Sequence, residues 1–102
     1  LLCAAAAIPH DGASQALVHG EPHAPMADFE VVHAAVHDAK HAGIPMRVAL
    51  VATTDLFYDP DDGLDGRWAA RGAAAVDMET ATLLTLAPLR GISAGSFLIA
   101  SS

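Results

Sequence analysis

An α/β fold, with a mixed and partly parallel sheet flanked by helices, follows from three features of this chain. Short apolar runs alternate with segments of helical periodicity along its 102 residues, which is typical of strands joined by helices. Apolar side chains make up 53% of the sequence, enough for a sheet buried between helices. Acidic and hydroxyl side chains directly follow two of the apolar runs, and ligand sites of open α/β sheets lie at the carboxyl ends of strands.

The first half of the chain predicts two strands separated by a loop and a helix. Residues 28–42 show the clearest helical pattern, because apolar side chains recur at helical spacing and Gly43 provides a C-cap. Pro9 is expected to end the opening strand. The apolar stripe of the helix comprises Phe29, Val32, Val36 and Ala39. The expected elements are a buried strand over residues 1–8, a loop over 15–26 with a short edge strand at 16–18, a helix over 28–42 and an interior strand over 46–52.

The second half continues the alternation of strands and helices. A run rich in Asp, Pro and Gly predicts a loop, and Pro88 is expected to kink or end the last helix early. The expected elements are a loop over residues 53–66, a short helix over 64–72, a strand over 73–76, a helix over 79–90 and a final strand over 94–100.

Composition excludes some classes of function. The net charge is −7 with five basic residues, so binding to nucleic acid or to an anionic membrane surface is not expected. No apolar run approaches the length of a membrane span. Cys3 is the only cysteine, which favours the reducing cytoplasm. The chain begins and ends inside apolar patterns, and we expect it to be a piece of a longer protein.

Two carboxylates, Asp77 and Glu79, bracket Met78 between an apolar run and a helix. One interpretation is a ligand site, because buried acids are rare unless they are paired. The other is capping, because acids in the first turn of a helix complement its dipole and free N–H groups. The pattern alone leaves both open.

A second polar segment, over residues 53–61, follows the predicted interior strand. Its hydroxyls, acids and two aromatic rings suit a pocket for a flat ligand that carries hydroxyl groups. The alternative is a turn in which Asp55 caps its own backbone and Phe57 fills the core.

Together the two segments resemble the nucleoside phosphorylase superfamily, which contains the purine nucleoside and uridine phosphorylases. Residues 76–81 look like its acid-Met-Glu signature, and residues 55–58 look like its Ser-Asp-x-Phe-Tyr segment. Further landmarks match in order and spacing at residues 11–14, 27–30 and 91–95. The resemblance implies that residues 1–102 form the central to C-terminal part of one three-layer α/β/α catalytic domain whose N-terminal part is absent from this chain.

The resemblance also implies roles for particular residues. Glu79 is expected to bind the ribose 2′- and 3′-hydroxyls, since a carboxylate accepts two hydroxyl donors. Met78 is expected to pack on the sugar, with Phe57 facing the base and Val76 lining the same pocket. Asp77 stands where the family usually has Glu. Without a gap, Ser102 falls where the purine enzymes have the Asp that protonates the leaving base. With one inserted residue, that Asp is expected just past Ser102.

The implied reaction is phosphorolysis of ribonucleosides, with inorganic phosphate as co-substrate and no other cofactor. Purines are favoured, because residues 59–63 offer neither the Gln nor the Arg with which uridine phosphorylases read uracil. Residues 80–85 look more like a uridine phosphorylase, which is the alternative. A nucleosidase, a non-catalytic nucleoside-binding fragment and a purely structural fragment remain further alternatives. The family's phosphate-binding arginines lie outside this segment or on a neighbouring subunit. The resemblance therefore implies a homo-oligomer and an inactive isolated fragment.

Three histidines, His33, His37 and His41, follow one another at a spacing of four residues on the predicted helix. Adjacent members of such a row can chelate zinc. Because the row lies beside the apolar stripe, on the flank shared with Glu30, we expect a solvated face and no metal. The acidic loop lacks the spacing of an EF-hand and is expected to be a solvated turn.

Overall fold

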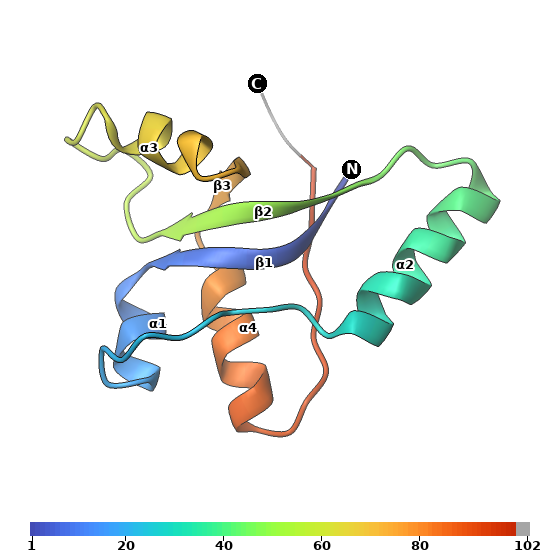
Figure 1. Cartoon of the computed structure of the whole chain (residues 1–102), viewed down its shortest axis with the longest axis horizontal. Helices are drawn as coiled ribbons and strands as arrows, with labels where there is room; N and C mark the ends of the chain where they lie inside the picture. The colour runs from blue at the N-terminus through green and yellow to red at the C-terminus, as the bar shows by residue number, and fades with distance from the viewer. Residues whose placement is uncertain (100–102) are drawn as a thin grey trace.

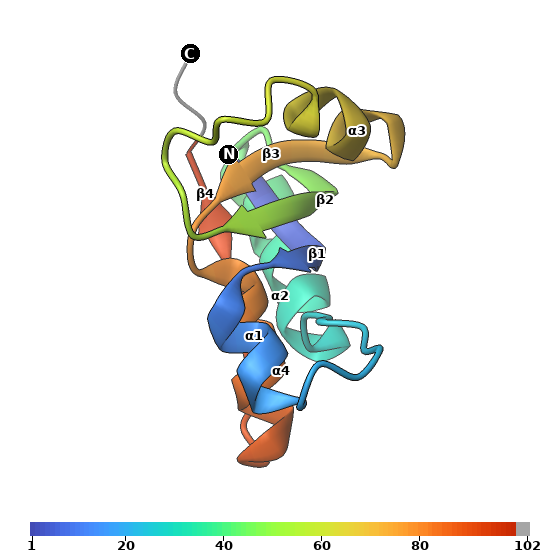
Figure 2. The same ribbon diagram turned by 90° about the vertical axis from the view of Figure 1, so that its left-hand side faces the viewer.

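The computed structural model describes residues 1–99, and these residues form one four-stranded sheet. The strand order is β3-β2-β1-β4, in which β1, β2 and β3 run parallel and β4 is antiparallel to β1. Figure 1 shows the three parallel strands, and β4 is labelled in Figure 2. The mixed, partly parallel sheet expected from the sequence is therefore confirmed. The strands are β1 (Leu2–His10), β2 (Arg47–Thr54), β3 (Ala73–Asp77) and β4 (Phe97–Leu98).

Helices lie on both faces of this sheet. Figure 2 shows α3 on one side of the strands, with α1 and α4 on the other. Helix α2 stands beside the sheet, near the start of β1 (Figure 1). The helices are α1 (Gly12–Leu17), α2 (Phe29–Ala42), α3 (Leu64–Ala70) and α4 (Thr80–Leu89).

Two small apolar cores, one on each face, hold the layers together. Neighbouring residues of β2 point to opposite faces, as strand geometry requires. Val51 packs in the cluster that contains Ala81 of α4, and Ala52 packs with Leu64 and Trp68 of α3. Because most of the other core residues are alanines, the helices approach the strands closely.

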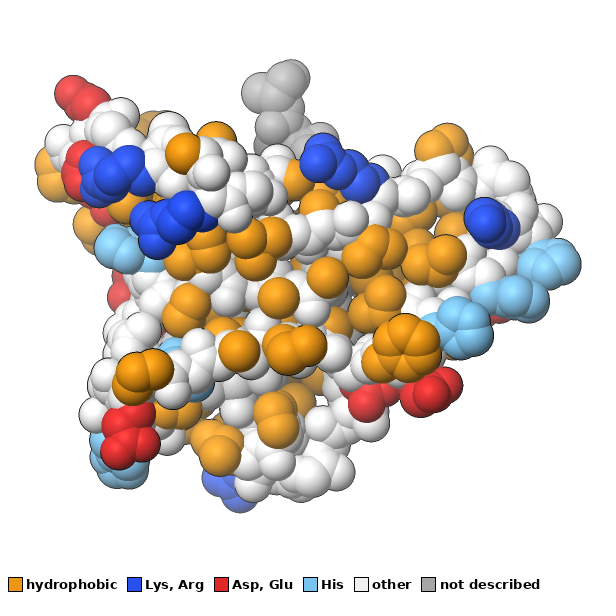
Figure 3. All heavy atoms as spheres, viewed as in Figure 1, with side chains coloured by type: hydrophobic (Ala, Val, Ile, Leu, Met, Phe, Trp, Pro, Cys, Tyr) orange, Lys and Arg blue, Asp and Glu red, His pale blue; other side chains and the backbone are white. Residues whose placement is uncertain are grey.

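Helix α2 begins and ends as its capping residues predict. The Asp28 carboxylate accepts a hydrogen bond from the Val31 N–H, and Gly43 adopts the left-handed conformation at φ 69°. The expected apolar stripe, however, does not bury itself on the sheet. Phe29 is 71% exposed, and Ala39 is the only buried residue of the helix. Figure 3 shows apolar side chains open to solvent over the sheet and α2 on this side of the molecule.

Two expectations about the first half are wrong. Gly12–Leu17 form a helix, not the start of a loop with an edge strand at 16–18. Asp11 starts this helix because its side chain accepts the Ser14 N–H. Strand β1 also runs through Pro9 to His10. Within residues 1–99, β4 pairs with Leu2 and Cys3 alone, so the missing N–H of Pro9 breaks no bond to that strand.

The second half follows the predicted order with changed ends. Pro88 lies in the last turn of α4, which continues one residue further to Leu89. The predicted strand over 94–100 is reduced to Phe97–Leu98, and Ala100 lies outside the described residues. None of the helices found between residues 1 and 99 has the length and apolar character needed to cross a membrane.

Candidate functional site

The carboxyl ends of β2 and β3 lie side by side, because these parallel strands are neighbours with Thr53 paired to Asp77. The segments that follow the two strands therefore meet at one edge of the sheet. A cavity of about 640 Å³ opens between them. Phe57 and Glu79, far apart in sequence, both line it. This is the position at which open α/β sheets bind ligands.

The cavity lining combines aromatic and acidic side chains. Trp68, which is 2% exposed, lies at its base, while Phe57 and Tyr58 are 77% and 87% exposed at its mouth. The rings of Phe57 and Tyr58 meet edge to face, with their centroids 4.8 Å apart. The lining residues are Thr54, Leu56, Phe57, Tyr58, Asp59, Asp61, Asp62, Asp65, Trp68, Val76, Asp77, Met78 and Glu79.

Asp77 is committed to the protein itself. Its Oδ1 accepts a hydrogen bond from Thr53 Oγ1 at 2.6 Å, and its Oδ2 accepts the Thr80 N–H at 2.9 Å together with the Thr80 hydroxyl. Thr53 Oγ1 in turn accepts the Ala81 N–H at 2.9 Å. Asp77 thus ties the start of α4 to the ends of β2 and β3, as the capping interpretation predicted for this acid.

The Glu79 side chain, unlike that of Asp77, makes no capping hydrogen bond to α4. Glu79 precedes α4 and is exposed. It lines the main cavity and also a smaller one of about 380 Å³ beside it. Thr80 and Ser96, whose hydroxyls lie 2.8 Å apart, line the smaller cavity. The Glu79 carboxylate can therefore receive donors from a ligand in either space.

A buried carboxylate at the end of β1 supports the same edge, and sequence reasoning did not single it out. Asp11 is 2% exposed and its Oδ2 accepts hydrogen bonds from the Ser14 N–H at 2.9 Å and from Thr82 Oγ1 at 2.6 Å. Burial alone raises the pKa of the Asp11 carboxyl, but these hydrogen bonds from Thr82 and Ser14 outweigh it and hold that pKa below its ordinary value.

Asp55 joins the Phe57 loop to the same turn. Its Oδ2 accepts the Gly12 N–H at 2.8 Å, and Asp55 is not among the residues that line the cavity. Asp55 thus caps a turn, as the alternative interpretation expected, but the turn is the one after β1 and not its own. Asp11-Gly12 after a strand predicted the turn itself. The sequence pattern did not predict that the Gly12 N–H of this turn bonds to Asp55.

The charged side chains that line the cavity are all acidic. Among the described residues, its lining contains six carboxylates and no Lys or Arg. Arg67 lies close by and pairs with Asp61 at 2.5 Å. The hydrogen bond from Arg67 holds the pKa of Asp61 below its usual value. A cavity of this charge favours a neutral ligand with hydroxyl or amino donors over an anion.

Five of the six residues expected to form the site come together here. Phe57, Val76, Asp77, Met78 and Glu79 all line the cavity. Ser102 lies outside the described residues. Across residues 1–99, His, Cys, Asp and Glu side chains do not form any group of three or more suited to a metal ion.

Fold and cavity thus define an α/β protein with a ligand site at the carboxyl ends of parallel strands. The family model described as the phosphorylase superfamily matches residues 1–102. The chain belongs to the phosphorylase superfamily.

This chain is similar to part of each of several named proteins. A DeoD-type purine nucleoside phosphorylase of Exiguobacterium sp. is 37% identical over 90 residues, which is 88% of this chain and 38% of the relative. Proteins of the same name from Alkaliphilus metalliredigens and Bacillus subtilis are 42% identical over 82 and 78 residues, covering 80% and 76% of this chain and 35% and 33% of those relatives. The chain spans little more than a third of the length of these relatives.

Proposed function

We propose that the protein catalyses the phosphorolysis of nucleosides, with purine nucleosides preferred. The observation that carries the proposal is the convergence of Phe57 and Glu79 on one cavity. Membership of the phosphorylase superfamily and the names of the relatives support it. The short segment between Phe57 and Met78 adds support for a purine.

In the proposed reaction, an oxygen of inorganic phosphate forms a bond to the anomeric carbon of the ribose while the bond from that carbon to the base nitrogen breaks. The electron pair leaves with the base, which takes up a proton. Glu79 holds the two ribose hydroxyls, and its negative charge stabilises the positive charge that develops on the sugar. Phe57 and Val76 face the base, and Met78 packs on the sugar.

Asp77 takes a positioning role in this proposal. Both of its oxygens are bonded to Thr53 and Thr80, so it holds the start of α4, and with it Glu79, against the strand ends. Asp77 is one methylene shorter than the Glu that the family usually has there, which suits these short contacts inside the protein better than a reach into the cavity.

Phosphate is the co-substrate in the proposal, with no further cofactor. The six carboxylates around the cavity repel an anion, so cationic side chains from outside the described lining have to hold it. We propose that a neighbouring subunit of a homo-oligomer contributes to this, as the sequence resemblance implies. Ser102 stays a prediction at the position beside the leaving base. A reducing cytoplasm suits the single, buried cysteine.

The test uses the complete protein and two substitutions, Glu79→Gln and Phe57→Ala. Losing a charged acceptor of two hydroxyls costs about 3–4 kcal/mol in the transition state, so we expect kcat/KM of Glu79→Gln to fall by about 100- to 1,000-fold. Trp68 lines the cavity, so its fluorescence reports nucleoside binding, which Phe57→Ala should weaken.

The matched control is Glu30→Gln, which changes an exposed carboxylate in the first turn of α2. This variant should keep the kinetics of the unchanged protein. A Glu79→Gln variant within threefold of the unchanged kcat/KM would remove Glu79 from the site. Turnover that proceeds equally well without phosphate would identify a nucleosidase in place of a phosphorylase.

A further inference from the structure

A pair of histidine rings lies on α2, outside the cavity. His37 and His41 are one helical turn apart, and their Nε2 atoms approach to 3.2 Å. The ring centroids are 4.4 Å apart with an angle of 49° between the ring planes. Both side chains are exposed, and histidines follow the outer edge of α2 in Figure 3. The spacing in sequence allowed this approach, but only the structure shows it.

The 3.2 Å between the two nitrogens is a hydrogen-bond distance, and it is also a separation that a shared metal ion allows. A Zn²⁺ ion bound at about 2.05 Å from each Nε2, 3.2 Å apart, subtends an angle of about 100°. That angle lies between octahedral and tetrahedral geometry. Both side chains are exposed, so their rings are free to rotate and direct both lone pairs at one ion.

A carboxylate stands behind one of the rings. Asp38 Oδ1 lies 3.5 Å from His37 Nδ1. Metal-binding histidines commonly direct their second ring nitrogen at a carboxylate, which fixes the tautomer and leaves Nε2 free for the ion. The net charge of −7 further favours a cation at the surface.

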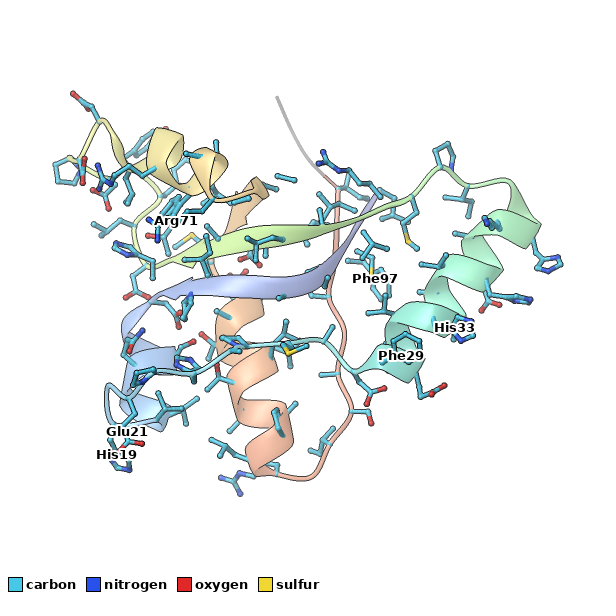
Figure 4. All side chains as sticks on the ribbon, viewed as in Figure 1. His19, Glu21, Phe29, His33, Arg71 and Phe97 are labelled. Carbon is cyan, nitrogen blue, oxygen red and sulfur yellow. The ribbon has the colours of Figure 1, made fainter. Side chains whose placement is uncertain are left out.

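The third histidine of the row does not take part. The ring of His33 lies beside that of Phe29 (Figure 4). The two rings stack, with centroids 5.6 Å apart and planes 15° from parallel. The site therefore has two protein ligands, in agreement with the finding that no group of three metal-binding side chains occurs among residues 1–99. Water completes the coordination of an ion held this way.

We propose that His37 and His41 form a two-point chelate for a first-row divalent transition metal such as Zn²⁺. The ion clips together the last two turns of α2, a helix whose exposed stripe leaves it with little packing on the sheet. This revises the expectation of a purely solvated row. It is independent of the proposed phosphorolysis, and its test does not measure activity.

The experiment is calorimetric titration of the complete protein with ZnCl₂ at neutral pH in a buffer that does not bind metals. We expect one site per chain that Mg²⁺ does not fill, because imidazole suits Zn²⁺ and oxygen ligands suit Mg²⁺. His37→Ala and His41→Ala should each weaken this site about a hundredfold, since the second ligand acts at high effective concentration. Asp38→Asn should weaken it about tenfold.

The matched control keeps the histidine count and moves one ring. The double substitution His41→Ala with Ala42→His places the second imidazole five residues from His37, on a different side of the helix. It should bind as weakly as His41→Ala, while His33→Ala should bind like the unchanged protein. Equal affinity of the shifted and unchanged proteins, or loss of the site in His33→Ala, overturns the proposal. Circular dichroism checks that α2 is intact in each variant.

Discussion

Replacing Thr53 by valine removes one hydroxyl that joins three elements while it keeps the shape of the side chain. Thr53 is 0% exposed at the end of β2. Its Oγ1 donates to Asp77 Oδ1 at 2.6 Å and accepts the Ala81 N–H at 2.9 Å. The Ala81 N–H lies in the first turn of α4, where backbone N–H groups have no partner within the helix.

The cost can be worked from these two bonds. Leaving the buried Ala81 N–H without an acceptor costs about 1–3 kcal/mol, and the bond to the charged Asp77 is worth about 1.5–3 kcal/mol. Asp77 keeps its bonds from Thr80, and the added methyl group returns about 1 kcal/mol through the hydrophobic effect. We therefore expect Thr53→Val to lower the free energy of unfolding by about 3 kcal/mol.

The assay is urea unfolding followed by the fluorescence of Trp68, which is buried beside the cavity. With a slope of about 1.5 kcal/mol/M, the midpoint should fall by about 2 M. The matched control is Thr85→Val in α4, because Thr85 is 5% exposed and its Oγ1 has no hydrogen-bond partner among residues 1–99. This substitution removes an unpaired buried hydroxyl and should leave stability unchanged or raise it by about 1 kcal/mol. Equal losses in the two variants would refute the reasoning.

Two further predictions concern the turn after β1 and the contact of α2 with Gly95. Asp11→Asn should destabilise the protein at neutral pH, and the difference should shrink as pH falls through the lowered pKa of Asp11, because the carboxylate contributes stability only while it is ionised; urea midpoints from pH 7 to pH 3 measure this. Gly95→Ala places a Cβ 2.7 Å from Val31 Cγ1 and should cost about 1–3 kcal/mol. Adding Val31→Ala to the Gly95→Ala protein should recover most of that stability. A thermal melt in which the double variant is no more stable than Gly95→Ala would contradict a clash between these two side chains.

Helix α2 shows what local sequence signals can and cannot predict. Its ends are set by Asp28 and Gly43, whose side-chain cap and positive φ act within a few residues. Its burial was not predictable in the same way. An apolar stripe predicts that one face of a helix is buried, but the whole fold determines which element packs on that face. Phe29 stays 71% exposed in the described residues.

Helix α1 was missed because its stability comes from distant partners. Residues 12–17 have little helical periodicity, and a helix of this length is unstable alone. It forms because Asp11 caps it and because Thr82 of α4 donates to the same carboxylate. That contact spans 71 positions of the sequence, which no local pattern can report.

The two acids that flank Met78 separate the contributions of chain order and of three-dimensional structure. Alternation along a strand turns neighbouring side chains in opposite directions, but Asp77 ends β3 and Glu79 lies beyond it, where the chain turns into α4. Asp77 therefore still pairs with the neighbouring strand, and its side chain accepts a hydrogen bond from Thr53 of that strand. Glu79 is past the last strand pair and faces the space that the Phe57 loop encloses. The capping interpretation is right for Asp77, the ligand interpretation stays a prediction for Glu79, and a shift of two residues along the chain separates the two acids.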